Sequence, residues 1–160
     1  MKKQHPYKYK IQKPVPLGVL PIHFKEGWLF VTGGPYGARL NGYLGVKMAK
    51  ELTLRCDVSI PTEDFKTPDK ADLDKGLYKV VRALLSDERV YVGCYAGKGR
   101  TGLFMAVLCK AFGYTNPVEH VRANYYPKAV ETKGQYDFVM NYRIPLKVRG
   151  AIFLKKYLGI

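Results

Sequence analysis

One stretch of the chain constrains the fold more than any other, because it has the pattern of a strand, a tight loop and a helix in direct succession. Residues 89–93 (RVYVG) are predicted to form a short buried strand. The glycine-rich residues 94–100 (CYAGKGR) follow, and the apolar residues 101–112 are predicted to form a helix that Gly113 ends. This arrangement presents backbone N–H groups and the positive end of a helix dipole to an anion. The segment therefore predicts an α/β domain with an anion site at the loop.

The rest of the chain alternates between further predicted strands and helices. We predict strands over residues 28–32 and 54–60, with Gly33-Gly34-Pro35 as a turn, and helices over residues 39–52, 71–85, 117–123, 132–142 and 147–160. In the last helix, Ile152, Phe153 and Tyr157 are expected to pack inward, and this docking on the domain is favoured over the alternative that the segment is an interfacial membrane anchor. The alternation continues without a repeat or a linker. It therefore predicts one domain over residues 1–160, an α/β three-layer fold with a small central sheet flanked by helices.

Positive charge is concentrated at the two ends of the chain. The formal net charge is +14, no acidic residue precedes Glu26, and none follows Asp137. We interpret residues 1–21 as a basic extended arm and residues 147–160 as a basic C-terminal segment. Such ends favour phosphorylated peptides, RNA or acidic lipid as partners, although a merely solvated surface explains them equally well.

The cysteines and apolar runs predict the compartment. No apolar run approaches the roughly 18 residues that a membrane-spanning helix needs, and the first residues lack a signal-peptide core. Cys56, Cys94 and Cys109 form no Cys-x-x-Cys pair, which favours reduced thiols and a cytoplasmic protein, or one of the host cytoplasm if the chain is viral. The three histidines show no metal-ligand spacing, so no metal site or cofactor is expected.

The loop itself predicts nucleophilic chemistry on phosphate. Its backbone N–H groups and the helix start can stabilise a thiolate on Cys94, which then acts as the nucleophile. Arg100 can donate two parallel hydrogen bonds to phosphoryl oxygens, and the Thr101 hydroxyl can bond to the sulfur. The expected phosphate-binding residues are Tyr95, Ala96, Gly97, Lys98, Gly99 and Arg100.

Other interpretations of the same loop fail on context. Residues 97–102 (GKGRTG) also fit G-x-G-x-x-G, but Asn116-Pro117 stands where a dinucleotide-binding unit needs a second strand and its acidic residue. A Walker A loop is excluded because Gly99, and not Ser or Thr, follows Lys98. Cys56 and Cys109 are predicted to be small buried hydrophobic residues without a catalytic role.

The segment CYAGKGRTG resembles the Cys-x5-Arg-Ser/Thr signature of protein-tyrosine and dual-specificity phosphatases, and in particular the AGKGRTG-type loops of the lipid phosphatase tumour suppressor and of cell-cycle dual-specificity phosphatases. The resemblance extends over residues 54–142 and implies the three-layer fold of that superfamily, with a mixed sheet. TEDFKTPD resembles the loop that carries the family's general acid, which implies that role for Asp64. AVETKGQ resembles the segment whose Gln orients the hydrolytic water, which implies that role for Gln135. One departure is Gly93, where the family usually has His.

The residues themselves leave some of these roles open. Glu63, Asp57 and Asp69 compete with Asp64 for the acid, although Asp69 fits a helix start better. A Gln on an amphipathic helix is by default a surface residue. Lys98 is expected to attract anionic substrate at the pocket mouth, and Tyr95 to lie beside the substrate or to shield the loop.

The resemblance and the residues together predict a phosphatase that hydrolyses phosphomonoesters through a cysteinyl-phosphate intermediate. Its expected substrates are phosphotyrosine or phosphoserine/threonine proteins. The alternatives are an RNA 5′-triphosphatase, which needs no acid loop, and a phosphoinositide phosphatase, for which a second Lys at position 95 is missing. A non-catalytic phosphate-binding module is disfavoured because Cys94, Arg100 and Thr101 are all present.

Overall fold

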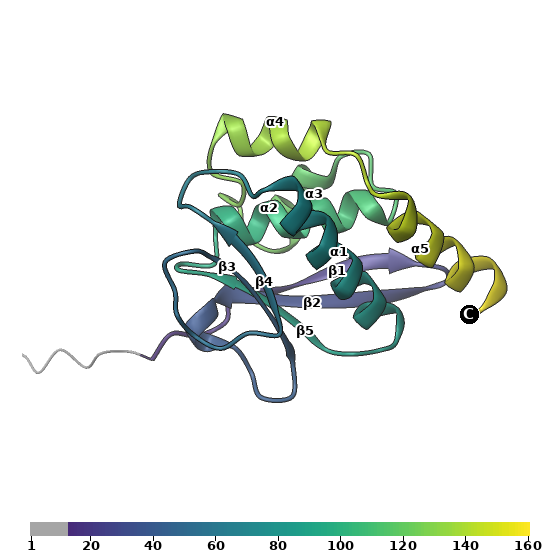
Figure 1. Cartoon of the computed structure of the whole chain (residues 1–160), viewed down its shortest axis with the longest axis horizontal. Helices are drawn as coiled ribbons and strands as arrows, with labels where there is room; N and C mark the ends of the chain where they lie inside the picture. Colours follow the sequence, from purple (N-terminus) through teal and green to yellow (C-terminus); the bar gives the residue numbers. More distant parts are fainter. Residues whose placement is uncertain (1–12) are drawn as a thin grey trace, which may run out of the picture.

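The structure is a computed structural model that describes residues 13–160 (Figure 1). Most of the predicted basic arm, residues 1–12, lies outside the described residues. In chain order the elements are β1 (Gly18–Phe24), β2 (Gly27–Pro35), the 3-10 helix η1 (Tyr36–Ala38), β3 (Leu44–Ala49), β4 (Val58–Thr62), α1 (Lys70–Leu85), β5 (Val90–Cys94), α2 (Gly99–Ala111), α3 (Pro117–Asn124), α4 (Lys133–Asn141) and α5 (Leu146–Leu158).

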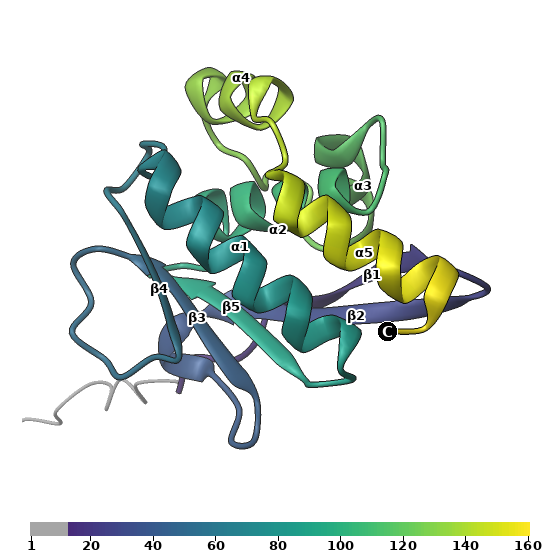
Figure 2. The ribbon, with the colours of Figure 1, turned by 45° about the vertical axis from the view of Figure 1, so that its right-hand side comes forward.

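The sheet is mixed and has the strand order β1-β2-β5-β3-β4. β1 and β2 form an antiparallel hairpin, whereas β2, β5, β3 and β4 pair in parallel. The helices cover one face, and η1 lies against the other (Figures 1 and 2). This is the predicted three-layer α/β fold. Because β5 is central, the loop that follows it lies at the carboxyl ends of the parallel strands, where open α/β sheets place their sites.

The core explains why α2 is apolar on every side. All residues of α2 from Gly99 to Cys109 are buried, because the helix packs against β5 below it and against α3 and α4 beside it. α1 is amphipathic instead and packs its apolar side on β4 and β5. The predicted helices over residues 71–85, 117–123, 132–142 and 147–160 are confirmed as α1, α3, α4 and α5.

The helix predicted over residues 39–52 is wrong. The structure has η1 and then β3 in this region. Leu44, Val46 and Met48 follow the period of two that a strand requires, and the apolar spacing of this short stretch fits both periods. β3 is bonded to β4 on one side and to β5 on the other, so its burial reflects its place in the sheet.

Three smaller predictions also need correction. Gly33-Gly34-Pro35 is the end of β2 and not a turn, because these residues pair with residues 92–94 of β5. Residues 18–21 of the predicted arm belong to β1, and the strand predicted over residues 54–60 lies at Val58–Thr62. No helix among residues 13–160 is long and apolar enough to cross a membrane.

Candidate active site

The predicted anion loop lies between β5 and α2. Cys94 is the last residue of β5 and is only 3% exposed. The Gly97 N–H donates a hydrogen bond to Cys94 Sγ over 3.2 Å, which shows that the loop curls back over the sulfur. The Tyr125 hydroxyl donates to the Gly97 carbonyl oxygen over 2.5 Å and braces the loop from the end of α3. Burial raises the pKa of Tyr125, so this hydroxyl stays a donor at neutral pH.

Two glycines let the loop pack directly on backbone. Gly97 has a φ of +79°, and a Cβ there would lie 2.1 Å from the carbonyl carbon of Gly34. A Cβ on Gly93 would lie 2.6 Å from Cα of Tyr36, the first residue of η1. The histidine that the family usually has before the nucleophile therefore has no room here, because the backbone of η1 occupies that space.

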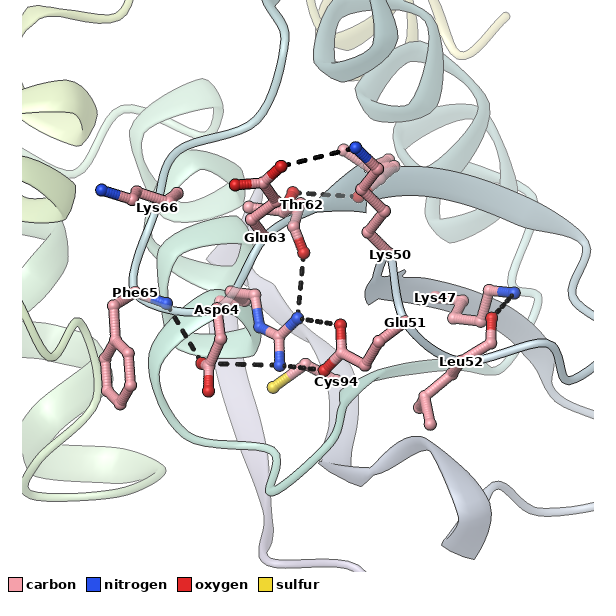
Figure 3. Close-up of polar contacts among 12 residues, drawn as sticks. Lys47, Lys50, Glu51, Leu52, Thr62, Glu63, Asp64, Phe65, Lys66 and Cys94 are labelled. Atoms are coloured by element: carbon pink, nitrogen blue, oxygen red, sulfur yellow. Dashed lines mark hydrogen bonds and ion pairs between the residues drawn. The ribbon is translucent and has the colours of Figure 1, made fainter.

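Arg100 is buried in a frame of acceptors from two segments, one that follows β3 and one at the end of β4. Its Nη1 and Nη2 each donate to the Glu51 carboxylate over 2.7 Å, and Nη1 also donates to the Thr62 carbonyl oxygen over 2.9 Å (Figure 3). Asp64 Oδ1 lies 3.5 Å from Nη2. Arg100 is 2% exposed, so few rotamers remain open to it. The hydrogen bond from Arg100 lowers the pKa of Glu51, so the pair is ionised at neutral pH.

Glu51 is the functional residue that the sequence interpretation missed. It follows β3 by two residues, and it lay inside the helix predicted over residues 39–52. A correct strand assignment would have supplied a signal, because an acidic residue just after a parallel strand lies at the edge of the sheet that carries the site. The pairing with Arg100 itself spans 49 positions of sequence.

The geometry separates the four candidate acids. Asp57 accepts from the Gly45 N–H over 2.7 Å, and Asp69 accepts from the Asp72 N–H and caps α1, as predicted. Glu63 pairs with Lys50 over 3.4 Å. Only Asp64 among these four has an ion-pair contact with Arg100, and its side chain is 59% exposed. It lies beside the guanidinium with one side open to solvent, as a group that meets a substrate must.

Gln135 is buried, which contradicts the surface position expected by default. Its Oε1 accepts from the N–H groups of Glu131 and Thr132 over 2.9 and 3.2 Å, and the Thr132 hydroxyl accepts from the Gln135 N–H. This capping box starts α4. Gln135 Nε2 donates to the carbonyl oxygen of Lys66 over 3.1 Å. Gln135 thus ties α4 to the loop that carries Asp64.

The remaining predicted residues divide between the loop and its mouth. Thr101 is fully buried, and its hydroxyl has no hydrogen-bond partner among residues 13–160. Tyr95 is 70% exposed at the surface of the loop. Lys98 Nζ lies 5.3 Å from the centroid of the Tyr126 ring, so the cation sits on an aromatic face beside the loop.

The two other cysteines differ from each other. Cys109 is buried as predicted, and burial raises its pKa to about 12, which makes it inert. Cys56 is only half-buried, so the prediction of a buried residue is wrong for it. Within the described part of the chain, no cluster of three or more His, Cys, Asp or Glu side chains could hold a metal ion.

Known proteins resemble this chain in sequence and in fold. A family described as Swiss Army Knife protein, DSP-PTPase phosphatase domain, matches residues 46–143. Two uncharacterized proteins of Methanocaldococcus jannaschii, MJ0215 and MJECL20, are each 37% identical, over 91 and 83 residues, or 57% and 52% of this chain. The chain spans only 57% and 56% of their lengths.

Solved structures of low sequence identity share the fold. Kinase associated phosphatase, with serine in place of its catalytic-site cysteine, has a TM-score of 0.58 at 17% sequence identity. The match covers 78% of this chain and 93% of the phosphatase chain. Tk-PTP in its active form has a TM-score of 0.55 at 20% identity, with 67% and 86% covered. PTPMT1 in complex with PI(5)P has a TM-score of 0.52 at 15% identity, with 71% and 80% covered.

Proposed function

Since the chain belongs to the Swiss Army Knife family of DSP-PTPase phosphatase domains, we propose that it hydrolyses phosphomonoesters through a cysteinyl-phosphate intermediate on Cys94. The observation that supports this proposal most strongly is how the hydrogen-bond donors of Arg100 are used. Of its five N–H donors, Glu51 takes two and Thr62 takes a third. Nε is buried and has no partner among residues 13–160. The second N–H of Nη2 makes no hydrogen bond within these residues, although Asp64 Oδ1 lies 3.5 Å from that nitrogen. These two donors lie on the same edge of the guanidinium and fit two phosphoryl oxygens.

In the first step, the Cys94 thiolate attacks phosphorus and the ester P–O bond breaks. The bond electrons leave with the ester oxygen, which takes a proton from Asp64. The loop N–H groups and Arg100 stabilise the charge on the phosphoryl oxygens during this transfer. We assign to the Thr101 hydroxyl, which is buried and has no partner among residues 13–160, the role of donating a hydrogen bond to the sulfur.

In the second step, water attacks phosphorus, the S–P bond breaks, and Cys94 leaves as a thiolate. The Asp64 carboxylate takes a proton from the attacking water. Gln135 has one N–H of Nε2 left over after its bond to Lys66, and we assign it the orientation of this water. No metal or cofactor takes part in either step. The reduced thiol that the reaction needs agrees with the cytoplasmic location expected from the sequence.

The proposed substrates are phosphotyrosine or phosphoserine/threonine proteins. A phosphoinositide phosphatase is the second candidate, because Lys98 is positioned beside the loop by Tyr126 and can meet further phosphates of a head group. PTPMT1, one of the structures with this fold, was solved with PI(5)P. A panel of phosphopeptides, phosphoinositides and 5′-triphosphorylated RNA distinguishes these candidates by their relative kcat/KM.

Phosphate release from an aryl phosphate tests the reaction. We expect turnover by the wild type in the absence of metal, and none by Cys94→Ser. A wild type that binds phosphopeptide without releasing phosphate from any substrate of the panel would contradict the proposal and leave a phosphate-binding module.

Substitution of Asp64 tests its role as the general acid in the same assay. A general acid gives its proton to the leaving oxygen, so Asp64→Asn should lower kcat about 100-fold or more for a substrate with a poor leaving group, and much less for one with a good leaving group. An equal change of kcat for both leaving groups would assign the proton to another group.

A further inference from the structure

Helix α5 (Leu146–Leu158) packs on the domain along one side only. Val148 is fully buried, and Ala151 and Ile152 are half-buried against the core. The helix lies against α1, and Lys147 Nζ is 4.7 Å from the ring centroid of Tyr78 of α1. One side of α5 therefore fixes its position, which leaves the opposite side free for another contact.

The outward side of α5 is also apolar. Phe153 and Tyr157, which the sequence predicts to pack inward, are 55% and 63% exposed, so the prediction is wrong for them. The exposed apolar side chains of this region are Leu146 (81%), Phe153, Leu154 (40%), Tyr157, Leu158 (62%) and Ile160 (76%). Leu146, Phe153 and Tyr157 share one face of the helix, so the exposed apolar side chains form a stripe, which Gly150 interrupts because it has no side chain. Such an exposed apolar stripe marks an interaction surface.

Cations flank the stripe. The chain has Arg143, Lys147, Arg149, Lys155 and Lys156 after Asp137 and no acidic residue there. All of these cations except Lys155 are exposed. The last two lie in the final turns of the helix, next to the most apolar part of the stripe.

This combination selects one kind of partner. A protein partner that covers the stripe must also neutralise the cations, and a second copy of α5 has no acid with which to do so. RNA would use the cations and the two aromatic rings, but it would leave Leu146, Leu154, Leu158 and Ile160 without a role. An anionic bilayer uses both features, because acyl chains take up the apolar side chains while head groups pair with the cations.

We propose that α5 binds the surface of a bilayer that contains anionic phospholipids, with Phe153, Tyr157 and their apolar neighbours inserted at the interface. The helix would lie in the plane of the membrane. Both ribbon views place α5 away from the loop between β5 and α2 (Figures 1 and 2). Binding should therefore not require Cys94, and the inference does not rest on the proposed phosphatase activity.

Sedimentation with lipid vesicles tests the proposal. The full chain should cosediment with vesicles of phosphatidylcholine mixed with phosphatidylserine, and should stay in the supernatant with phosphatidylcholine alone. Cys94→Ser should bind as the wild type does. The pair Phe153→Ser and Tyr157→Ser should weaken binding about tenfold or more, because the inserted apolar area is lost. These side chains are exposed, so circular dichroism should show an unchanged fold and melting temperature.

The charge contribution has a matched control. Arg149→Glu with Lys156→Glu should weaken binding about tenfold or more. Lys75→Glu with Lys79→Glu changes the net charge by the same amount on an exposed part of α1, and should weaken binding far less. The proposal would be overturned if the wild type did not bind the vesicles, or if both charge-reversal pairs lost binding equally. It would also be overturned if the Phe153 and Tyr157 variant bound as the wild type does. A wild-type dimer that the same variant converts to a monomer would overturn it as well.

Discussion

At the scale of single residues, Glu51 decides how Arg100 is presented to a phosphate. In Glu51→Gln an acceptor remains, but the charge that holds the guanidinium is lost. We expect kcat for an aryl phosphate to fall about tenfold or more, since misplaced transition-state donors cost that much. Glu63→Gln is the matched control, because Glu63 pairs with Lys50 and not with Arg100. Equal kcat in the wild type and in Glu51→Gln would show that the frame around Arg100 is not needed.

The same pair makes stability depend on pH. The pKa of Glu51 is lowered by its hydrogen bond with Arg100, so the folded state favours the ionised carboxylate. This stabilisation is present at neutral pH and is lost as the pH falls through the lowered pKa. Glu51 is 45% exposed, so we expect Glu51→Gln to cost only about 1 kcal/mol at pH 7. The difference from the wild type in urea unfolding should shrink below the usual pKa range of a carboxyl group.

Gly93 stands where the phosphatases that the loop resembles usually have His. Gly93→Ala should destabilise the domain by about 1–3 kcal/mol, because the new Cβ would lie 2.6 Å from Cα of Tyr36. Gly150→Ala is the matched control, because a Cβ at this position would have no atom within 4 Å. The substitution also replaces a glycine inside a helix. It should stabilise the domain by about 0.5–1 kcal/mol. If thermal unfolding shows no loss for Gly93→Ala, η1 does not restrict this position.

At the scale of the elements, α4 and the Asp64 loop are joined by Gln135. Thr132→Ala removes the hydroxyl that caps α4 but leaves the bond between Gln135 and Lys66. Gln135→Ala keeps the bond from its own N–H to the Thr132 hydroxyl, but it removes the side-chain bonds to Glu131, Thr132 and Lys66. We expect each change to cost about 1–2 kcal/mol of unfolding free energy. Only Gln135→Ala should also lower kcat, because it frees the acid loop and removes the water-orienting amide. Equal kcat values in the two variants would exclude both roles.

The elements also show how far the sequence could predict the structure. The β5, loop and α2 unit was predictable because its strand, glycines and helix are contiguous, and with it Cys94, Arg100 and Thr101. β3 was not, because Leu44, Val46 and Met48 fit a helix and a strand alike until neighbouring strands are in place. Glu51 and the contact between Gly93 and Tyr36 depend on segments far apart in the chain. No local pattern contains them.

At the scale of the whole molecule, the charge of +14 should steer anionic substrates toward the site. We expect kcat/KM for a phosphopeptide to fall about three- to tenfold as ionic strength rises from about 0.05 to 0.2 M, because screening weakens attraction beyond about 10 Å. The kcat should change little, since steering acts before the bound state. If kcat/KM does not depend on salt, the charge does not steer the substrate and serves other contacts, such as the one proposed for α5.

Detection of a covalent phosphoenzyme on Cys94 is the sharpest test of the proposed reaction. Wild-type protein and Asp64→Asn are mixed with an aryl phosphate, quenched in acid within the first turnover, digested and analysed by mass spectrometry. We expect one added phosphoryl group on the peptide that contains Cys94, and none in Cys94→Ser. Phosphate release that continues in Cys94→Ser, or that proceeds in the wild type with no phosphoryl group on this peptide, would contradict it.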